Sequence, residues 1–109
     1  MSIQLPKLIA NYFEADRNSD ANDVANCFTD DGIVRDEGHT YVGHDAIRQW
    51  KADASTKYNY TVEPFALDEE ANLVVVTSHV VGNFPGSPAD LRYHFELADD
   101  GIAALEVKL

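Results

Sequence analysis

The chain is poor in cysteine, in positive charge and in long apolar runs, and each shortage excludes a class of protein. Its single cysteine, Cys27, cannot form an intrachain disulfide. Only 8 Lys and Arg residues stand against 19 Asp and Glu, and the formal net charge is −11. Nucleic acids and anionic membranes are both bound by positive charge, so neither is an expected partner. No basic segment with an apolar core opens the chain and no apolar run reaches membrane length, which predicts a cytoplasmic protein.

The sequence also has no pattern that would indicate a metal site or a reactive thiol. The four histidines have no metal-ligand spacing, so we expect neither a metal site nor a cofactor. Cys27 lies in the apolar stretch 24–28, where a small buried side chain is the better interpretation than a nucleophile.

The remaining features describe one domain over residues 1–109, with an ordinary 45% of hydrophobic residues. Apolar spacing predicts helices over about 5–18, 21–28 and 44–57. Alternation and β-branched residues predict strands over about 32–37, 40–42, 59–67, 73–84, 91–97 and 102–109. Helices that are separate from a mostly antiparallel sheet define the α+β class. We expect the helices to cover one face of a curved sheet, with a small-molecule pocket at the mouth between them.

Local signals refine this assignment. Asp20 or Asn22 is the expected N-cap of the second helix. Asp30-Asp31 is interpreted as part of a turn before the first strand. Pro64 has no backbone N–H to donate, so it indicates an edge strand or a bulge.

The stretch CFTDDGIVRDEG, residues 27–38, raises the main functional question. In a strand, Val34 and Asp36 point to the same side. Either the strand has reached the surface and Asp36 is solvated, or Asp36 lines a pocket. A carboxylate buried without a cation has a raised pKa and is a competent base near neutral pH.

Aromatic and aliphatic side chains on neighbouring elements complete this candidate pocket. Tyr12 lies on the apolar stripe of the first helix, Ile47 and Trp50 lie near one side of the third, and Tyr93 shares a strand face with Phe95. The alternative is that Tyr12 and Tyr93 are core tyrosines with satisfied hydroxyls, and that Trp50 is core packing.

Three segments, NYFEADRNSD (11–20), FTDDGIVRD (28–36) and GHDAIRQW (43–50), carry a resemblance to a known superfamily. In this order they resemble the nuclear transport factor 2-like (NTF2-like) superfamily, nearest to its SnoaL-like polyketide cyclases and ketosteroid isomerases. The resemblance implies a cone-shaped, cystatin-like α+β fold with a deep apolar cavity. It also implies a homodimer formed through the sheet and an apolar small-molecule ligand.

The comparison with the isomerases assigns roles to particular residues. It implies that Asp36 is the general base and that Tyr12 is an oxyanion-hole donor. Tyr93 falls where the isomerases have a protonated aspartic acid, so a second phenol replaces that donor. Beside these roles, the shared strand and helix faces described above predict that a substrate contacts four side chains, Val34, Ile47, Trp50 and Phe95.

Other branches of the superfamily leave alternatives open. His79 either pairs with an acid, as in a dehydratase-like site, or lies on the sheet surface that faces a dimer partner. Asp90 and Arg92 either resemble part of an epoxide hydrolase site or form a surface ion pair. Phe84, in the loop 83–88, either caps the cavity or packs on a partner subunit.

Three functional hypotheses follow. The first is a proton-transfer enzyme, an isomerase or an aldol-type cyclase, that acts on an apolar carbonyl compound. The second is a non-catalytic module that binds an apolar ligand. The third is a protein-interaction domain with an exposed apolar patch. A fold that hosts many functions does not choose between them.

Overall fold

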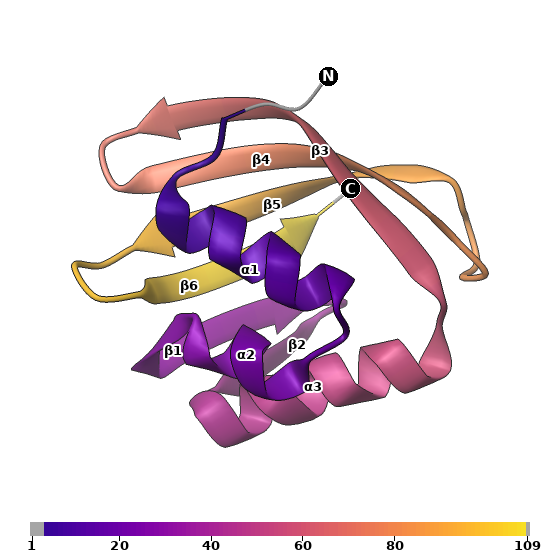
Figure 1. Ribbon diagram of the computed structural model, residues 1–109, viewed down its shortest axis with the longest axis horizontal. Coiled ribbons are helices and arrows are strands. Elements are labelled where there is room, and N and C mark those ends of the chain that lie inside the picture. Colours follow the sequence, from indigo (N-terminus) through magenta and orange to yellow (C-terminus); the bar gives the residue numbers. More distant parts are fainter. Residues whose placement is uncertain (1–3, 109) are drawn as a thin grey trace.

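Helices and strands follow one another in the predicted order. The computed structural model describes residues 4–108 (Figure 1). The elements are α1 (Lys7–Arg17), α2 (Ala21–Asn26), β1 (Phe28–Asp36), β2 (His39–Val42), α3 (His44–Lys57), β3 (Tyr60–Glu70), β4 (Leu73–Gly82), β5 (Ala89–Leu97) and β6 (Ile102–Lys108). None of the helices in this part of the chain is both long enough and apolar enough to span a bilayer.

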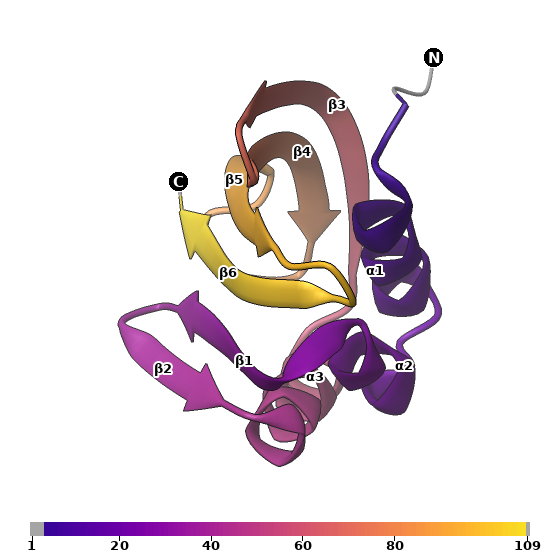
Figure 2. The same ribbon diagram turned by 90° about the vertical axis from the view of Figure 1, so that its left-hand side faces the viewer.

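The sheet has the strand order β2-β1-β6-β5-β4-β3. Its neighbours pair antiparallel except for β1 and β6, which are parallel. Strands β3 to β6 curl beside α1, and α2 and α3 lie together next to β1 (Figure 2). The sheet is curved and not closed, so the predicted mostly antiparallel α+β fold is confirmed.

The helices begin and end where local chemistry stops them. On α1 the buried residues Ile9, Tyr12 and Phe13 recur at helical spacing, which turns one stripe toward the sheet. Of the two candidate caps for α2, Asp20 is the one used, because its side chain accepts a hydrogen bond from the Asp23 backbone N–H at 3.1 Å.

The predicted turn at Asp30-Asp31 is wrong, because both residues lie within β1. The strand begins at Phe28 and contains a bulge: Phe28 pairs with Ile102, but the next pair is Ile33 with Ala104. Gly32 permits this bulge, since a Cβ there would lie 2.8 Å from the Phe28 Cβ.

The other β-strands differ from prediction mainly in length. Strand β3 continues to Glu70 rather than ending at residue 67, and β4 ends at Gly82. Pro64 lies at a bulge of β3, which is also an edge strand, so both readings of this proline are confirmed.

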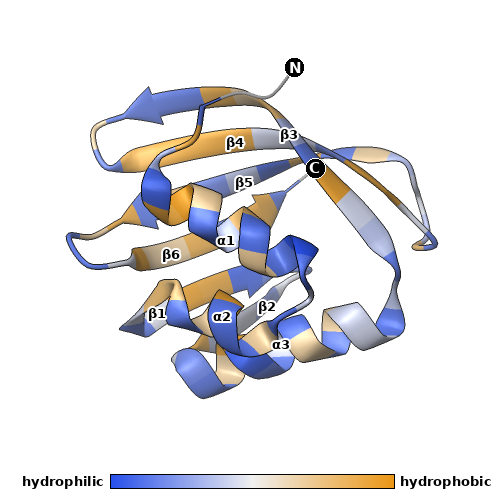
Figure 3. Ribbon diagram, viewed as in Figure 1, coloured by the Kyte–Doolittle hydropathy of each residue, from blue (hydrophilic) through white to orange (hydrophobic). Residues whose placement is uncertain are grey.

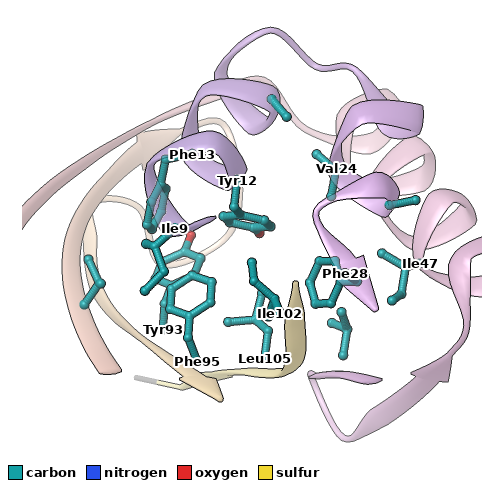
Figure 4. Packing of buried hydrophobic residues seen from close by; sticks show 14 of the residues in the cluster. Ile9, Tyr12, Phe13, Val24, Phe28, Ile47, Tyr93, Phe95, Ile102 and Leu105 are labelled. Carbon is teal, nitrogen blue, oxygen red and sulfur yellow. The ribbon is translucent and has the colours of Figure 1, made fainter. Parts of the chain in front are cut away.

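Aromatic rings form the centre of the core (Figure 4). Tyr12 of α1 lies 5.5 Å from Phe95 and 6.5 Å from Tyr93 between ring centroids, and Phe13 lies 5.2 Å from Tyr93. Hydrophobic residues are prominent along β4 and β6, whereas the β5–β6 turn is hydrophilic (Figure 3). This aromatic layer fixes α1 on the sheet and forms the floor below the candidate site.

Candidate functional site

A cavity of about 380 Å³ opens between the inner face of the sheet and the helices. Its aromatic lining residues are Tyr12, Tyr41, Trp50, Tyr58, Tyr60, Phe84 and Tyr93. Its acidic lining residues are Asp16, Asp36, Glu37 and Asp53. Such a volume holds a small molecule, and the wall combines apolar surface with a few polar groups as binding pockets usually do.

Asp36 lines this cavity, so of its two alternatives the pocket-lining one is correct. The Trp50 indole Nε1–H donates a hydrogen bond to Asp36 Oδ2 at 3.0 Å. Burial raises the pKa of Asp36 above its ordinary value, and the hydrogen bond from Trp50 offsets part of that rise. The partner of this carboxylate is therefore a neutral donor, which orients it but leaves it able to take up a proton.

Two phenols stand in the same cavity. The side chains of Tyr12 and Tyr93 are 1% and 6% exposed, and both line the wall. Within residues 4–108 neither hydroxyl has a hydrogen-bond partner. Burial, followed by the charge of Asp16, raises the pKa of both tyrosines well above the ordinary value. Both therefore remain neutral O–H donors, and they differ from the core tyrosines with satisfied hydroxyls that were the alternative.

The other four predicted contact residues divide into two groups. Trp50 lines the cavity, next to Tyr41 at 6.3 Å between ring centroids. Val34, Ile47 and Phe95 are completely buried in the hydrophobic core and are not part of the cavity wall. Phe95 packs against Tyr12 and Tyr93, so it supports the wall from behind.

A buried ion pair beside the cavity was not predicted from the sequence. Lys51 Nζ of α3 lies 2.6 Å from Asp16 Oδ1 of α1, and it donates to the Tyr60 hydroxyl of β3 at 3.0 Å. The exposed fractions of Asp16 and Lys51 are 8% and 1%. Burial lowers the pKa of Lys51, but Asp16 and then Tyr60 outweigh it, so this pKa is raised and the ammonium stays charged.

Helical spacing carried a signal for this pair. Asp16 follows Tyr12 by four residues, and Lys51 follows Ile47 by four, so each polar residue lies on a buried helical face. Two opposite charges on the inner faces of two helices indicate a buried ion pair when the helices meet.

The loop 83–88 closes one side of the cavity. Phe84 and Pro85 line it, and the Phe84 ring packs edge-on against Tyr58 with centroids 6.2 Å apart. The Asn59 backbone N–H donates to Asn83 Oδ1 at 2.8 Å, which ties the loop to the start of β3. Phe84 therefore lines the cavity, as the first of its two alternatives predicts.

Two other predicted arrangements lie away from the cavity. His79 Nδ1 is 2.8 Å from Asp90 Oδ1, but both side chains are more than half exposed. Neither these two residues nor Arg92 line the cavity. The dehydratase-like and epoxide hydrolase-like sites are therefore not assembled here.

Cys27 is half-buried at the end of α2, and its thiol donates to the Asp23 carbonyl. Burial and then the charge of Asp23 raise the pKa of this thiol. A thiol that is harder to ionise fits the structural interpretation of Cys27.

Comparison with known proteins agrees with the fold. The SnoaL-like domain family model matches residues 9–105. A "putative polyketide cyclase" from Sinorhizobium meliloti is 36% identical, with 95% of each chain covered and a TM-score of 0.91. No curated protein sequence matches the chain significantly.

More distant structures share the fold alone. A protein with a ketosteroid isomerase-like fold from Catenulispora acidiphila, in complex with trimethylamine, is 18% identical with a TM-score of 0.86, covering 97% of this chain and 87% of that one. An NTF2-like protein of unknown function from Cytophaga hutchinsonii is 15% identical with a TM-score of 0.75, covering 98% and 92%. The chain thus has the NTF2-like fold and belongs to the SnoaL-like domain family.

Proposed function

We propose that the protein is an enzyme that moves a proton beside a carbonyl group, an isomerase or an aldol-type cyclase, with Asp36 as general base. The observation that carries this proposal is one carboxylate in a cavity, bonded to a neutral donor, together with two phenol hydroxyls that have no partner in residues 4–108. A base and preorganised donors for an oxyanion are the two requirements of this chemistry. The similarity to a "putative polyketide cyclase" supports the same reaction class.

The roles in the reaction follow from the donors and acceptors present. The hydrogen bond from Trp50 orients the Asp36 carboxylate, and this carboxylate takes a proton from the carbon next to the carbonyl group. The C–H electron pair moves into an enolate, and Tyr12 and Tyr93 donate hydrogen bonds to its oxygen. In an isomerisation the protonated Asp36 returns its proton to another carbon. In a cyclisation the enolate carbon attacks a second carbonyl carbon, and the alkoxide formed takes that proton.

Proton exchange is the direct test. Enones and β-keto compounds are incubated with the protein in heavy water, and deuterium uptake at the carbon next to the carbonyl group is followed by NMR. Asp36→Asn is expected to reduce the rate by about 10²- to 10⁴-fold, the usual contribution of a positioned base. Asp99→Asn, in the exposed β5–β6 turn, is the matched control and should leave the rate unchanged.

The same experiment can also contradict the enzymatic proposal. If ligands bind while wild type and Asp36→Asn both fail to exchange protons, the enzymatic proposal is wrong and the protein is a binding module. A carbon-13 NMR titration that finds an ordinary pKa for Asp36 would also contradict the proposal, because the base then lacks its dry surroundings.

We also propose that a homodimer forms through the outer face of the sheet. Phe65, Leu73 and Val81 of β3 and β4 are 47%, 49% and 44% exposed, so these two strands offer apolar side chains to a partner. Light scattering after size-exclusion chromatography should find a dimer for the wild type and a monomer for Val81→Glu. A monomeric wild type would contradict this proposal.

A further inference from the structure

The cavity wall is rich in aromatic rings and carboxylates but poor in positive charge. Four carboxylates line it, and Lys57 is the one Lys or Arg among the lining residues. The Lys57 ammonium is exposed and lies 5.2 Å from the centroid of the Tyr58 ring. Lys51 lies behind the wall, 1% exposed, and its charge is matched by Asp16.

This balance bears on the chemistry proposed above. Proton transfer to Asp36 moves a negative charge from its carboxylate to the substrate oxygen and leaves the net charge of the cavity unchanged, with more carboxylates than cations in the wall. The phenols of Tyr12 and Tyr93 supply hydrogen bonds but no net charge. A positive charge on the substrate would be attracted by this excess of carboxylates throughout the reaction.

The wall also has the components that hold an organic cation. Trp50 and Tyr41 are neighbouring rings in the lining, and Trp50 is hydrogen-bonded to Asp36. Glu37, the residue after Asp36, lines the same cavity. Aromatic faces attract ammonium groups through their quadrupole, most strongly for tryptophan, and adjacent carboxylates add direct Coulomb attraction.

We propose that the ligands of this cavity are carbonyl compounds that carry an ammonium or quaternary ammonium group, held by Trp50, Tyr41 and the adjacent carboxylates. The carbonyl half of this inference rests on the proposed function, whereas the cationic half rests on the wall. Such a ligand turns the enolate into a zwitterion, and its positive charge is attracted to the carboxylates of the wall.

A pair of matched probes tests the cationic half without any turnover. Choline and 3,3-dimethyl-1-butanol have the same shape, but a neutral carbon in the second replaces the charged nitrogen of the first. The chain has a single tryptophan, Trp50, in the cavity wall, so its fluorescence reports binding of either probe. Choline is expected to bind about tenfold more tightly, the effect of a cation–π contact in a desolvated site, and the preference should shrink as salt is added.

Two double variants separate the site from the overall charge of the protein. Glu37→Gln/Asp53→Asn removes two exposed carboxylates of the wall and should abolish most of the preference for choline. Glu69→Gln/Glu70→Gln removes two exposed carboxylates at the other end of β3 from Tyr60 and should leave it unchanged. Equal loss in both variants would overturn the proposal, because the preference would then reflect net charge alone.

The outcomes distinguish this inference from the proposed function. If the neutral alcohol binds as tightly as choline, the cationic ligand class is wrong, while Asp36-dependent exchange in neutral ketones still supports the enzyme. If choline is preferred but no carbonyl compound exchanges protons, the cationic ligand class stands and the enzymatic proposal fails.

Discussion

Asp16 and Asp36 line the same cavity but have opposite kinds of partner. Asp16 is 8% exposed and contacts the Lys51 ammonium at 2.6 Å, with the Tyr60 hydroxyl at 3.3 Å. Asp36 is less deeply buried, and its side chain accepts from the neutral Trp50 N–H. Burial raises the pKa of Asp36, whose hydrogen-bond donor Trp50 is neutral. The two partners thus give the carboxylates different roles: the neutral donor leaves Asp36 suited to accept a proton, whereas the ammonium of Lys51 holds Asp16 in an ion pair.

The largest expected effect is the loss of stability when the ion pair between Asp16 and Lys51 is broken. Lys51→Met removes the counter-charge and leaves the Asp16 carboxylate buried, so the free energy of unfolding should fall by about 3–5 kcal/mol. Urea denaturation at pH 7 measures this change. The double variant Asp16→Asn/Lys51→Met has no uncompensated charge and should regain most of the loss. A single variant within about 1 kcal/mol of wild type would show that the pair does not hold α1 to α3.

The second-largest effect should be a difference in the free energy of unfolding between two tyrosine variants. Tyr60→Phe removes a hydroxyl that contacts both Lys51 and Asp16, and should lower the free energy of unfolding by about 1.5–3 kcal/mol. Tyr12→Phe removes a hydroxyl without a partner in the described residues and should change it by less than about 1 kcal/mol. Only Tyr12→Phe should slow proton exchange without a matching loss of stability. Equal destabilisation by both changes would contradict the assignment of a structural role to Tyr60 and a reactive role to Tyr12.

A smaller effect should appear in the pH dependence of stability. The pKa of Asp36 is raised above about 3.8 in the folded protein, so between the unfolded and folded pKa values the folded state binds more protons. The contribution of Asp36 to stability is therefore full below the unfolded pKa and is lost as pH rises through the folded pKa. Asp36→Asn removes this loss.

Urea denaturation of both proteins from pH 3 to pH 7 tests the sign. The free energy of unfolding of Asp36→Asn minus that of wild type should grow as pH rises. A difference that shrinks with pH would mean that Asp36 is stabilised as an anion, like a carboxylate beside a cation.

The smallest expected effect is the change in the pKa of Asp36 when its hydrogen bond from the Trp50 indole is removed. The hydrogen bond from Trp50 lowers the pKa of Asp36, so Trp50→Phe should raise that pKa further. Carbon-13 NMR of the Asp36 carboxyl group measures it. Tyr41→Phe changes a neighbouring wall residue that does not bond to Asp36 and serves as the control. An unchanged pKa of Asp36 in Trp50→Phe would show that the indole orients the carboxylate without changing its pKa.

Element types were predictable because they depend on local spacing. The stripe of α1, the Asp20 cap and the edge position of Pro64 all follow from periodicity or from backbone chemistry. The β1 bulge was missed because it depends on a close approach within the strand, here between Gly32 and Phe28, whereas Asp-Asp-Gly is typical of an ordinary turn.

The sequence also predicted which side chains point inward, but not whether they reach the core or the cavity. Val34 and Asp36 share a strand face, as alternation predicts, yet Val34 is completely buried in the core and Asp36 lines the cavity. Ile47 and Trp50 differ in the same way on α3. Periodicity gives the side of an element that faces inward, whereas packing of the opposite layer decides whether that side meets other side chains or open space.

The sequence by itself determined the α+β order, the core-facing stripes, the general acidity and the strand face that Asp36 shares with Val34, because each depends on composition or on near neighbours in the chain. Only the tertiary structure decided that Lys51 meets Asp16 and not Asp36. Those three residues come from α3, α1 and β1, and electrostatic energy depends on distances in space that sequence separation does not fix.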